Sequence, residues 1–272
     1  MSNPSPKSQP PDISNHTLSR MRIDPTPRTK ALSAFGLYAL KNRSVRVSRA
    51  NVRSIQPTNS TSVVSIAGSS GYTGACILAV QSALVAGTGI IKVLVPESQK
   101  NLYDSCLTAP IIVPMDDHSS GTFIFDHVDQ ILSEIEWADV VLFGPGLETD
   151  APAVKWMAEV LRNINKPLIL DASGFQPIID KKLIIDELPQ ETILTPHYGE
   201  FSRIFNLNLQ KTQENPIAAV KSIIHQLNGR VLILKGATNI IVTSEAKLLL
   251  MAHGSSALAT AGSGDVLTGI LA

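Results

Sequence analysis

The pattern of apolar and polar positions changes at about residue 61. Residues 1–30 are rich in Pro, Ser and Thr and have no sustained hydrophobic period, which predicts a partly disordered segment. From residue 61 onward, short runs of β-branched and other apolar residues alternate with segments of helical spacing. We therefore expect one folded domain over residues 61–272, preceded by an extension over residues 1–60.

The apolar runs of this domain are continuous, which is typical of parallel strands covered on both faces. Strands are expected over 63–68, 90–96, 111–115, 140–146, 167–173, 192–196 and 231–237, and helices over 73–87, 128–138, 150–163 and 214–227. Residues 238–244 and 246–252 follow without a helix between them and predict an antiparallel hairpin. The pattern indicates an α/β fold with a mostly parallel central sheet, helices on both faces and an antiparallel edge hairpin.

Charge is distributed unevenly between the two parts of the chain. Residues 1–60 hold ten of the 23 Lys and Arg residues but only two of the 23 acidic residues. The mildly acidic remainder argues against nucleic-acid binding by the folded domain. Residues 31–56 combine apolar and basic residues, which suits either an organelle-targeting segment or a helix packed on the domain edge and followed by a linker.

Two further features concern the compartment of the protein. No apolar run reaches the roughly 18 residues that span a bilayer, so no membrane segment is expected. Cys76 and Cys106 lie in apolar patterns, which predicts buried thiols in a reducing compartment. A cytoplasmic location is expected, with organelle targeting as the alternative.

Ligands of such sheets bind beyond the carboxyl ends of the strands, so the residues after each strand are the candidates. The runs GSSGYTGA (68–75) and GPGLE (144–148) form glycine-rich turns whose amides suit an anion, although tight turns need glycine for purely structural reasons too. Asp171 follows a strand and either orients a ligand or caps a helix or turn.

Three charged or titratable residues follow later strands. His197 and Glu200 stand three residues apart at the start of a helix, where both can face the same mouth, although Glu at this place is also a common capping residue. Lys235 ends a buried strand, where its charge requires a partner. The candidate partners are a ligand phosphate, Glu200 and Asp171.

The run AGSGDVLTGILA (261–272) places two glycines and a serine before an apolar helix. The amides of Gly262, Ser263 and Gly264 can converge on a phosphate at the helix N-terminus. Asp265 then lies within reach of the atom that is phosphorylated. An acid in the first helical turn also stabilises the helix dipole, which is the structural alternative.

In this order, the clusters resemble the ribokinase-like superfamily, and more closely the ADP/ATP-dependent NAD(P)H-hydrate dehydratases. The resemblance covers about 61–272. It is carried by GSSGYTGA (68–75), ALVAGTGIIKVLVP (83–96), GPGL (144–147), LDA (170–172), TPHYGEF (195–201), KGATN (235–239) and ATAGSGDVLTG (259–269). It implies a ribokinase-like fold and a carbon–oxygen lyase that returns hydrated NADH or NADPH to the reduced nucleotide by phosphorylating the ring hydroxyl. ADP or ATP is the implied phosphoryl donor, with Mg2+.

The resemblance also implies roles for individual residues and an assembly. Asp265 matches the catalytic base, and Glu200 matches an acid that organises Mg2+ indirectly through its waters. Contacts to the hydrated nicotinamide nucleotide fall on Ala75, Gly146, His197 and Asp265, and contacts to the adenine nucleotide on Lys235, Gly236, Ala237, Thr238, Asn239 and Gly264. Members of the family often form tetramers, which implies a homo-oligomer.

Some positions depart from the family pattern. Ser255 stands where an Asn is common, Ala261 where a Gly is common, and a His-Lys-Gly loop before the first strand is missing. The chain stops at Ala272, in a final helix that is marginal without packing partners, so we expect either a fragment or a truncated relative. Two alternatives follow: a ribokinase-like kinase of hydroxymethylpyrimidine, pyridoxal or a sugar, and a non-catalytic nucleotide-binding relative.

Overall fold

The computed structural model describes residues 61–252, 254–255 and 258–272 of the chain. The expectations for residues 1–60, including the targeting segment and the edge helix, lie outside the described residues. Among the residues that are described, no helix is long and apolar enough to cross a membrane.

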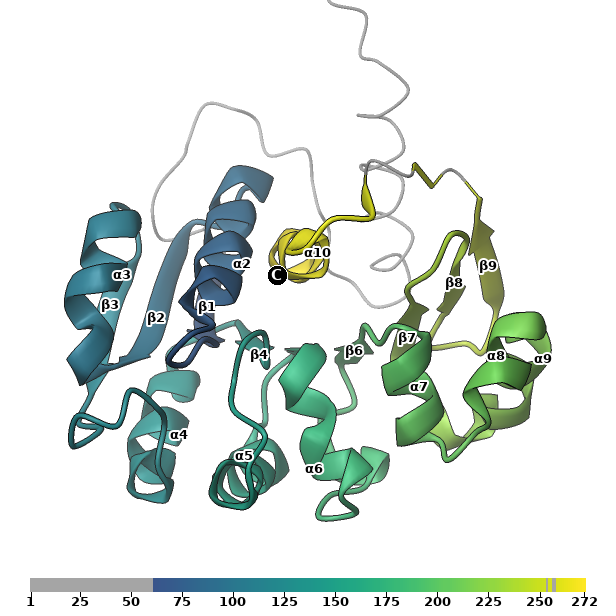
Figure 1. Cartoon of the computed structure of the whole chain (residues 1–272), viewed down its shortest axis with the longest axis horizontal. Coiled ribbons are helices and arrows are strands. Elements are labelled where there is room, and N and C mark those ends of the chain that lie inside the picture. Colours follow the sequence, from purple (N-terminus) through teal and green to yellow (C-terminus); the bar gives the residue numbers. More distant parts are fainter. Residues whose placement is uncertain (1–60, 253, 256–257) are drawn as a thin grey trace, which may run out of the picture. The chain divides into compact units, whose positions relative to one another are not determined.

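In the described part of the chain, nine strands form one sheet in the order β3-β2-β1-β4-β5-β6-β7-β8-β9 (Figure 1). The strands β1 to β7 pair in parallel, and β8 is antiparallel to both β7 and β9. The strands are β1 (Ser62–Ile66), β2 (Ile90–Pro96), β3 (Ile111–Met115), β4 (Val140–Phe143), β5 (Leu168–Leu170), β6 (Thr192–Leu194), β7 (Val231–Leu234), β8 (Asn239–Val242) and β9 (Leu248–Met251). The mostly parallel sheet and the edge hairpin are confirmed.

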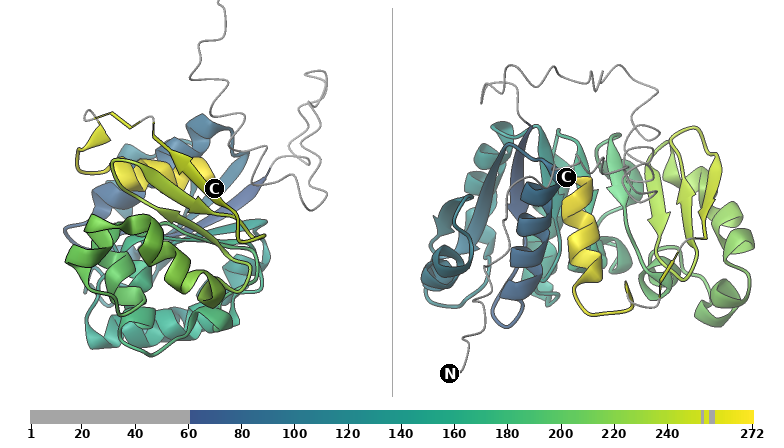
Figure 2. Two further views of the ribbon diagram at one scale, coloured as in Figure 1. Left: turned by 90° about the vertical axis from the view of Figure 1, so that its right-hand side faces the viewer. Right: turned by 90° about the horizontal axis from the view of Figure 1, so that it is seen from above.

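Helices cover both faces of this sheet (Figures 1 and 2). On one face lie α2 (Thr73–Ala86), α3 (Lys100–Cys106) and α10 (Ser263–Leu271). On the other lie α4 (Val128–Glu136), α5 (Ala151–Asn163), α6 (Gln176–Ile179), α7 (Tyr198–Ile204), α8 (Leu209–Glu214) and α9 (Pro216–Ile223). Single 3-10 turns complete the connections as η2 (Glu97–Gln99), η3 (Phe125–His127), η4 (Ala172–Phe175), η5 (Ile185–Glu187) and η6 (Ile224–Leu227).

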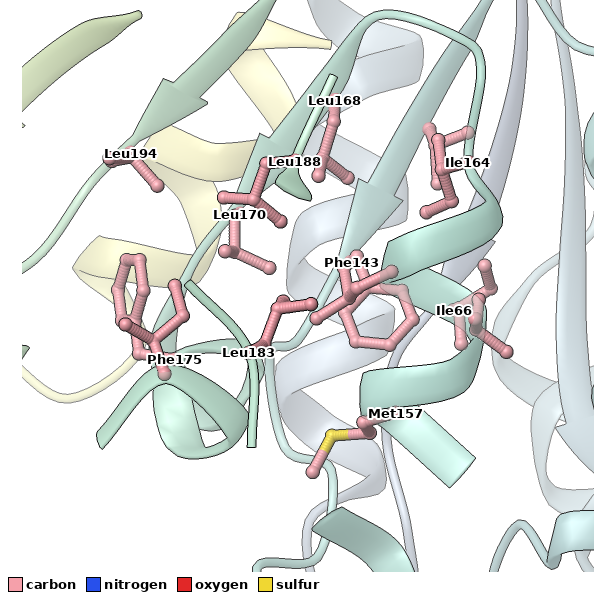
Figure 3. Packing of buried hydrophobic residues seen from close by; sticks show 14 of the residues in the cluster. Ile66, Phe143, Met157, Ile164, Leu168, Leu170, Phe175, Leu183, Leu188 and Leu194 are labelled. Carbon is pink, nitrogen blue, oxygen red and sulfur yellow. The ribbon is translucent and has the colours of Figure 1, made fainter. Parts of the chain in front are cut away.

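The larger core lies between the sheet and the α4–α9 layer. Ile66 and Phe143 point from β1 and β4 toward Met157 of α5, and Leu170 points from β5 toward Phe175 (Figure 3). All five side chains are fully buried. Since burying one such side chain stabilises a fold by about 1.5–3 kcal/mol, this layer holds the strands in register and so fixes where their carboxyl ends lie.

On the opposite face, small residues let α10 pack directly against α2. A Cβ on Gly269 would lie 1.9 Å from the carbonyl oxygen of Ala79, so the two backbones approach as only glycine allows. Ala79 and its neighbour on the same helix face, Ala83, are fully buried. The final helix, which is too short to be stable alone, therefore has α2 as its packing partner.

The structure also corrects local expectations. The strand expected over 167–173 ends at Leu170, because the chain enters η4 with Ala172 at a φ of 50°. The helix expected over 214–227 starts only at Pro216 and tightens into η6 at Ile224. The expectation that both cysteines are buried was wrong for Cys106, which ends α3 on its exposed side, whereas Cys76 is buried in α2.

Candidate active site

A buried ion pair lies at the carboxyl edge of the sheet. Asp171 follows β5 and is only 1% exposed. Its Oδ1 accepts a hydrogen bond from Nζ of Lys235, after β7, at 2.7 Å. Its Oδ2 accepts one from Oγ1 of Thr268, in α10, at 2.6 Å. Of the candidate partners of Lys235, the protein thus provides Asp171 and not Glu200, and the Asp171 side chain makes no capping bond to η4.

Asp265 lies in the first turn of α10, close to this pair. Its side chain is half-buried. Burial is the main cause that raises its pKa above the ordinary value, the nearby charge of Asp171 raises it further, and Lys235 opposes the shift. A carboxylate whose pKa is raised in this way is a better proton acceptor than an ordinary surface aspartate.

The turn before α10 brings backbone amides to the same place. Gly262 has a φ of +86°, which favours glycine, and a Cβ there would lie 2.5 Å from the Leu78 side chain. The amide of Ser263 donates to the carbonyl oxygen of Thr260 at 3.3 Å, so it is used within the turn. The amide of Gly264 belongs to the first helical turn, whose amides have no intrahelical acceptor. Of the three amides expected to form a phosphate cradle, that of Ser263 is thus already engaged.

His197 and Glu200 form a reciprocal cap at the start of α7. His197 Nδ1 accepts hydrogen bonds from the amides of Gly199 at 2.9 Å and Glu200 at 3.2 Å. Glu200 Oε2 accepts the amide of His197 at 2.9 Å. The His197 ring remains 57% exposed, with Nε2 3.4 Å from Glu200 Oε1. The structural role of this pair is therefore present, and the imidazole of His197 stays exposed while Glu200 is buried.

The backbone places this pair next to Lys235. The amide of Lys235 donates to the carbonyl oxygen of Pro196 at 2.9 Å, and His197 and Lys235 form a parallel bridge beyond the ends of β6 and β7. The histidine cap and the Asp171–Lys235 pair therefore occupy adjacent positions on one edge.

The loop after Lys235 is held by a hydrogen bond between two of its own residues. The Asn239 Oδ1 accepts the amide of Gly236 at 3.1 Å. A Cβ on Gly236 would lie 2.6 Å from the hydroxyl of Tyr198, so this loop packs against the start of α7. Gly236 and Ala237 are exposed, and Thr238 is half-buried. This stretch of the loop is therefore open to a ligand.

The two remaining candidates, Ala75 and Gly146, lie together in the segments that follow β1 and β4, next to β5 in the sheet. A Cβ on Gly146, which has a φ of +69°, would lie 3.0 Å from the Cβ of Ala75 and 2.7 Å from the carbonyl oxygen of Tyr72. The hydroxyl of Ser69 donates to the carbonyl oxygen of Gly146 at 2.8 Å, which ties the two turns together.

Within the described part of the chain, no three His, Cys, Asp or Glu side chains cluster in a way that could hold a metal ion. Magnesium commonly keeps several waters and binds through substrate phosphates with one or two carboxylates. The carboxylate of Glu200, whose Oε1 lies 3.4 Å from His197 Nε2, fits the second arrangement and not an all-protein cage.

Thr268 is a site residue that the sequence reasoning missed. It lies three positions after Asp265 on α10 and is fully buried. Residues three or four apart share a helix face, so its spacing from Asp265 and Gly264 was a usable signal.

The fold and the sheet edge define a ribokinase-like protein. A ribokinase-like superfamily protein from Enterococcus faecalis superposes with a TM-score of 0.67 at 25% identity, covering 79% of this chain and 70% of the other. The ADP/ATP-dependent NAD(P)H-hydrate dehydratase of Bacillus subtilis, co-crystallised with ATP/Mg2+ and soaked with CoA, superposes with a TM-score of 0.60 at 25% identity, covering 77% and 72%.

The sequence comparison is more specific. The profile of the NAD(P)H-hydrate dehydratase family matches residues 63–272, and the chain belongs to this family. The bifunctional NAD(P)H-hydrate repair enzyme of Moorella thermoacetica is 31% identical over 210 residues, which are 77% of this chain and 39% of that enzyme. The chain thus spans about two fifths of the length of this curated relative.

Proposed function

We propose that this chain dehydrates hydrated NADH and NADPH back to the reduced nucleotides, with ADP or ATP as phosphoryl donor. The observation that carries the proposal is the position of Asp265: a half-buried carboxylate with a raised pKa opens α10 beside the Asp171–Lys235 pair. Family membership supports this chemistry, and the Bacillus subtilis dehydratase co-crystallised with ATP/Mg2+ supports the choice of donor.

The reaction has a leaving-group problem that phosphorylation solves. Hydroxide leaves the hydrated ring poorly. Asp265 accepts the proton of the ring hydroxyl. The hydroxyl oxygen attacks the terminal phosphorus of the nucleotide, and the bond from that phosphorus to the bridging oxygen breaks. The ring nitrogen then donates its electron pair, the carbon–oxygen bond breaks and phosphate leaves. Loss of a proton from the neighbouring ring carbon restores the dihydronicotinamide ring of the reduced nucleotide. ADP thereby becomes AMP and phosphate.

The residues around Asp265 supply positioning and positive charge, which carry most of the catalysis in phosphoryl transfer. The Gly264 amide and the N-terminus of α10 face the transferred group. Lys235 gives one N–H to Asp171 and keeps two for phosphate oxygens. Magnesium bound to the nucleotide would neutralise phosphate charge, and Glu200 would hold its waters.

The remaining contacts follow the layout of the sheet edge. We assign the nicotinamide nucleotide to Ala75, Gly146, His197 and Asp265, and the adenine nucleotide to Gly264 and the loop 235–239. The adjacency of Ala75 to Gly146 supports their assignment to one ligand. The bridge between His197 and Lys235 supports a boundary at which the two ligands meet. We also propose a cytoplasmic homo-oligomer, a tetramer by family resemblance, which light scattering would test.

One assay tests the function directly. The chain is incubated with hydrated NADH or hydrated NADPH and with ADP or ATP, and the return of the reduced-nicotinamide absorbance is followed. We expect recovery that depends on nucleotide and magnesium. Phosphorylation of a hydroxymethylpyrimidine, pyridoxal or a sugar without any repair would identify a kinase instead. Nucleotide binding in calorimetry with no turnover would identify a non-catalytic relative.

A further inference from the structure

Asp171 is a buried acid to which the proposed chemistry gives no role. Its carboxylate accepts hydrogen bonds from two side chains that are far from it in sequence. Lys235 lies 64 positions away and Thr268 lies 97 positions away. The two oxygens bind one partner each, so the carboxylate joins the end of β5 to the end of β7 and to α10.

The geometry shows what this link fixes. A Cβ on Gly264 would lie 3.3 Å from Lys235 Nζ and 3.9 Å from Asp171 Oδ2, so the first turn of α10 rests against the ion pair. The Thr268 hydroxyl also lies 3.0 Å from the carbonyl oxygen of Gly264. A lysine side chain carries its ammonium on a flexible four-carbon stem, so without Asp171 that charge has no fixed position.

We propose that Asp171 is a positioning residue of the phosphoryl-transfer site. Through Lys235 it fixes an ammonium for the phosphates, and through Thr268 it fixes the turn that carries Gly264 and Asp265. The proposal rests on the proposed function, because it assigns the nucleotide phosphates to this turn. Asp171 itself touches neither the substrate nor the nucleotide in this role.

The charges around Asp265 give the proposal a distinctive readout. Asp265 is faced by Asp171 from β5, by Lys235 from β7 and by the buried thiol of Cys76 from α2. Asp171 raises its pKa, whereas Lys235 lowers it. The two members of one ion pair therefore act on the base in opposite directions.

The experiment compares four variants of the full chain: Asp171→Asn, Lys235→Met, Thr268→Val and Thr268→Ser. We expect Asp171→Asn to lower kcat by about a hundredfold, the scale of a misplaced catalytic geometry, and to move the acid limb of the kcat/KM profile to lower pH. Lys235→Met should move that limb to higher pH. Thr268→Val should lower kcat about tenfold, and Thr268→Ser, which keeps the hydroxyl, should restore it to within about twofold.

A matched control separates positioning from general stability. Asp186→Asn removes an acid that pairs with the buried Arg230 at 3.3 Å, away from α10. It should lower Tm and leave the acid limb unmoved. If Asp171→Asn behaves in the same way, or if Thr268→Ser is as slow as Thr268→Val, the positioning role is wrong. If Asp171→Asn does not fold, the comparison of Thr268→Ser with Thr268→Val tests the positioning role instead.

Failure of the proposed function would look different. In that case the wild-type chain itself would repair no hydrate with either nucleotide. The positioning role would then be measured by calorimetry with ADP and ATP. Tenfold weaker binding in Thr268→Val than in Thr268→Ser would support it, and equal binding would overturn it.

Discussion

Two glycine-rich runs, GSSGY at 68–72 just before α2 and GSGD at 262–265 at the start of α10, look alike in sequence and lead into adjacent helices. In the first turn the amides are used by the protein: Gly68 donates to Pro145 at 2.7 Å, and Ser70 donates to Gly121 at 3.0 Å. In the second, the amide of Ser263 stays within its own turn, while Gly264 and Asp265 face Lys235 and Asp171. The first turn joins loops, and the second presents amides and charge.

The comparison shows that such a turn is not an anion site by its residues alone. What distinguishes the two is whether neighbouring loops supply carbonyl acceptors to the amides. Loops 117–121 and 144–147 do so for the first turn. An acid in the first helical turn is present in α10 and absent from α2.

The largest expected effect comes from the acid that only the second turn has. Asp265→Asn should lower kcat by about a hundredfold or more, because the proton acceptor is lost. Nucleotide affinity in calorimetry should stay within about threefold of wild type, since the amides and Lys235 remain. Normal turnover of this variant would show that Asp265 is not the base.

The pH dependence of activity should report the same carboxylate. Burial and Asp171 raise the pKa of Asp265 from 3.8, so kcat/KM should fall as the pH drops through that raised value. The effect on stability has the opposite sign. A folded-state pKa above the unfolded value favours the folded state most at low pH, and this contribution is lost as the pH rises through the folded pKa. Asp265→Asn should therefore raise Tm at neutral pH and not at low pH, as thermal melts at both would show.

One substitution made in both turns should separate them most clearly. Gly68→Ala would place a Cβ 2.3 Å from the buried Tyr103 hydroxyl at a φ of +82°, so we expect a loss of stability of about 1–3 kcal/mol. Gly264→Ala would place a Cβ 3.3 Å from Lys235 Nζ and 3.9 Å from Asp171 Oδ2, so the ammonium has to shift slightly, and the substitution gains helix propensity. We therefore expect Tm to hold while kcat falls. Urea unfolding and turnover of both variants are the measurements. The same pattern in both would mean that the turns do not differ as described.

The smallest effect is expected at Ser69, which joins the first turn to Gly146. Ser69→Ala removes a hydrogen bond of 2.8 Å and should lower the free energy of unfolding by about 1 kcal/mol. kcat should change by less than about twofold. A large fall in kcat with unchanged stability would give the first turn a catalytic role.

The sheet could be predicted because its strands are continuous apolar runs, and the hairpin because nothing helical separates residues 238–244 from 246–252. The short helix α3 and the exposed position of Cys106 could not, since a seven-residue helix with a single buried side chain, Tyr103, carries little periodic signal. Elements of this length follow tertiary packing more than local preference.

The candidate site was predicted residue by residue but not as a network. The need of Lys235 for a partner follows from its place at the end of a buried strand. The strand order determines which carboxylate pairs with Lys235. Because β5 and β7 flank β6, Asp171 lies within hydrogen-bonding distance of Lys235. The contact of Thr268 depends on how α10 docks against α2, which no local pattern specifies.

The bond between Asp171 and Thr268 closes a loop of 97 residues. During synthesis the sheet and its buried ion pair have all their residues before α10 has left the ribosome. We expect so long a loop to close late, because the loss of chain entropy on closure precedes the favourable free energy of the contact. A chain with a folded sheet and an undocked α10 would therefore lack chemical competence, and activity should appear only when α10 docks, after the fluorescence of the buried Trp156 has reached its native value.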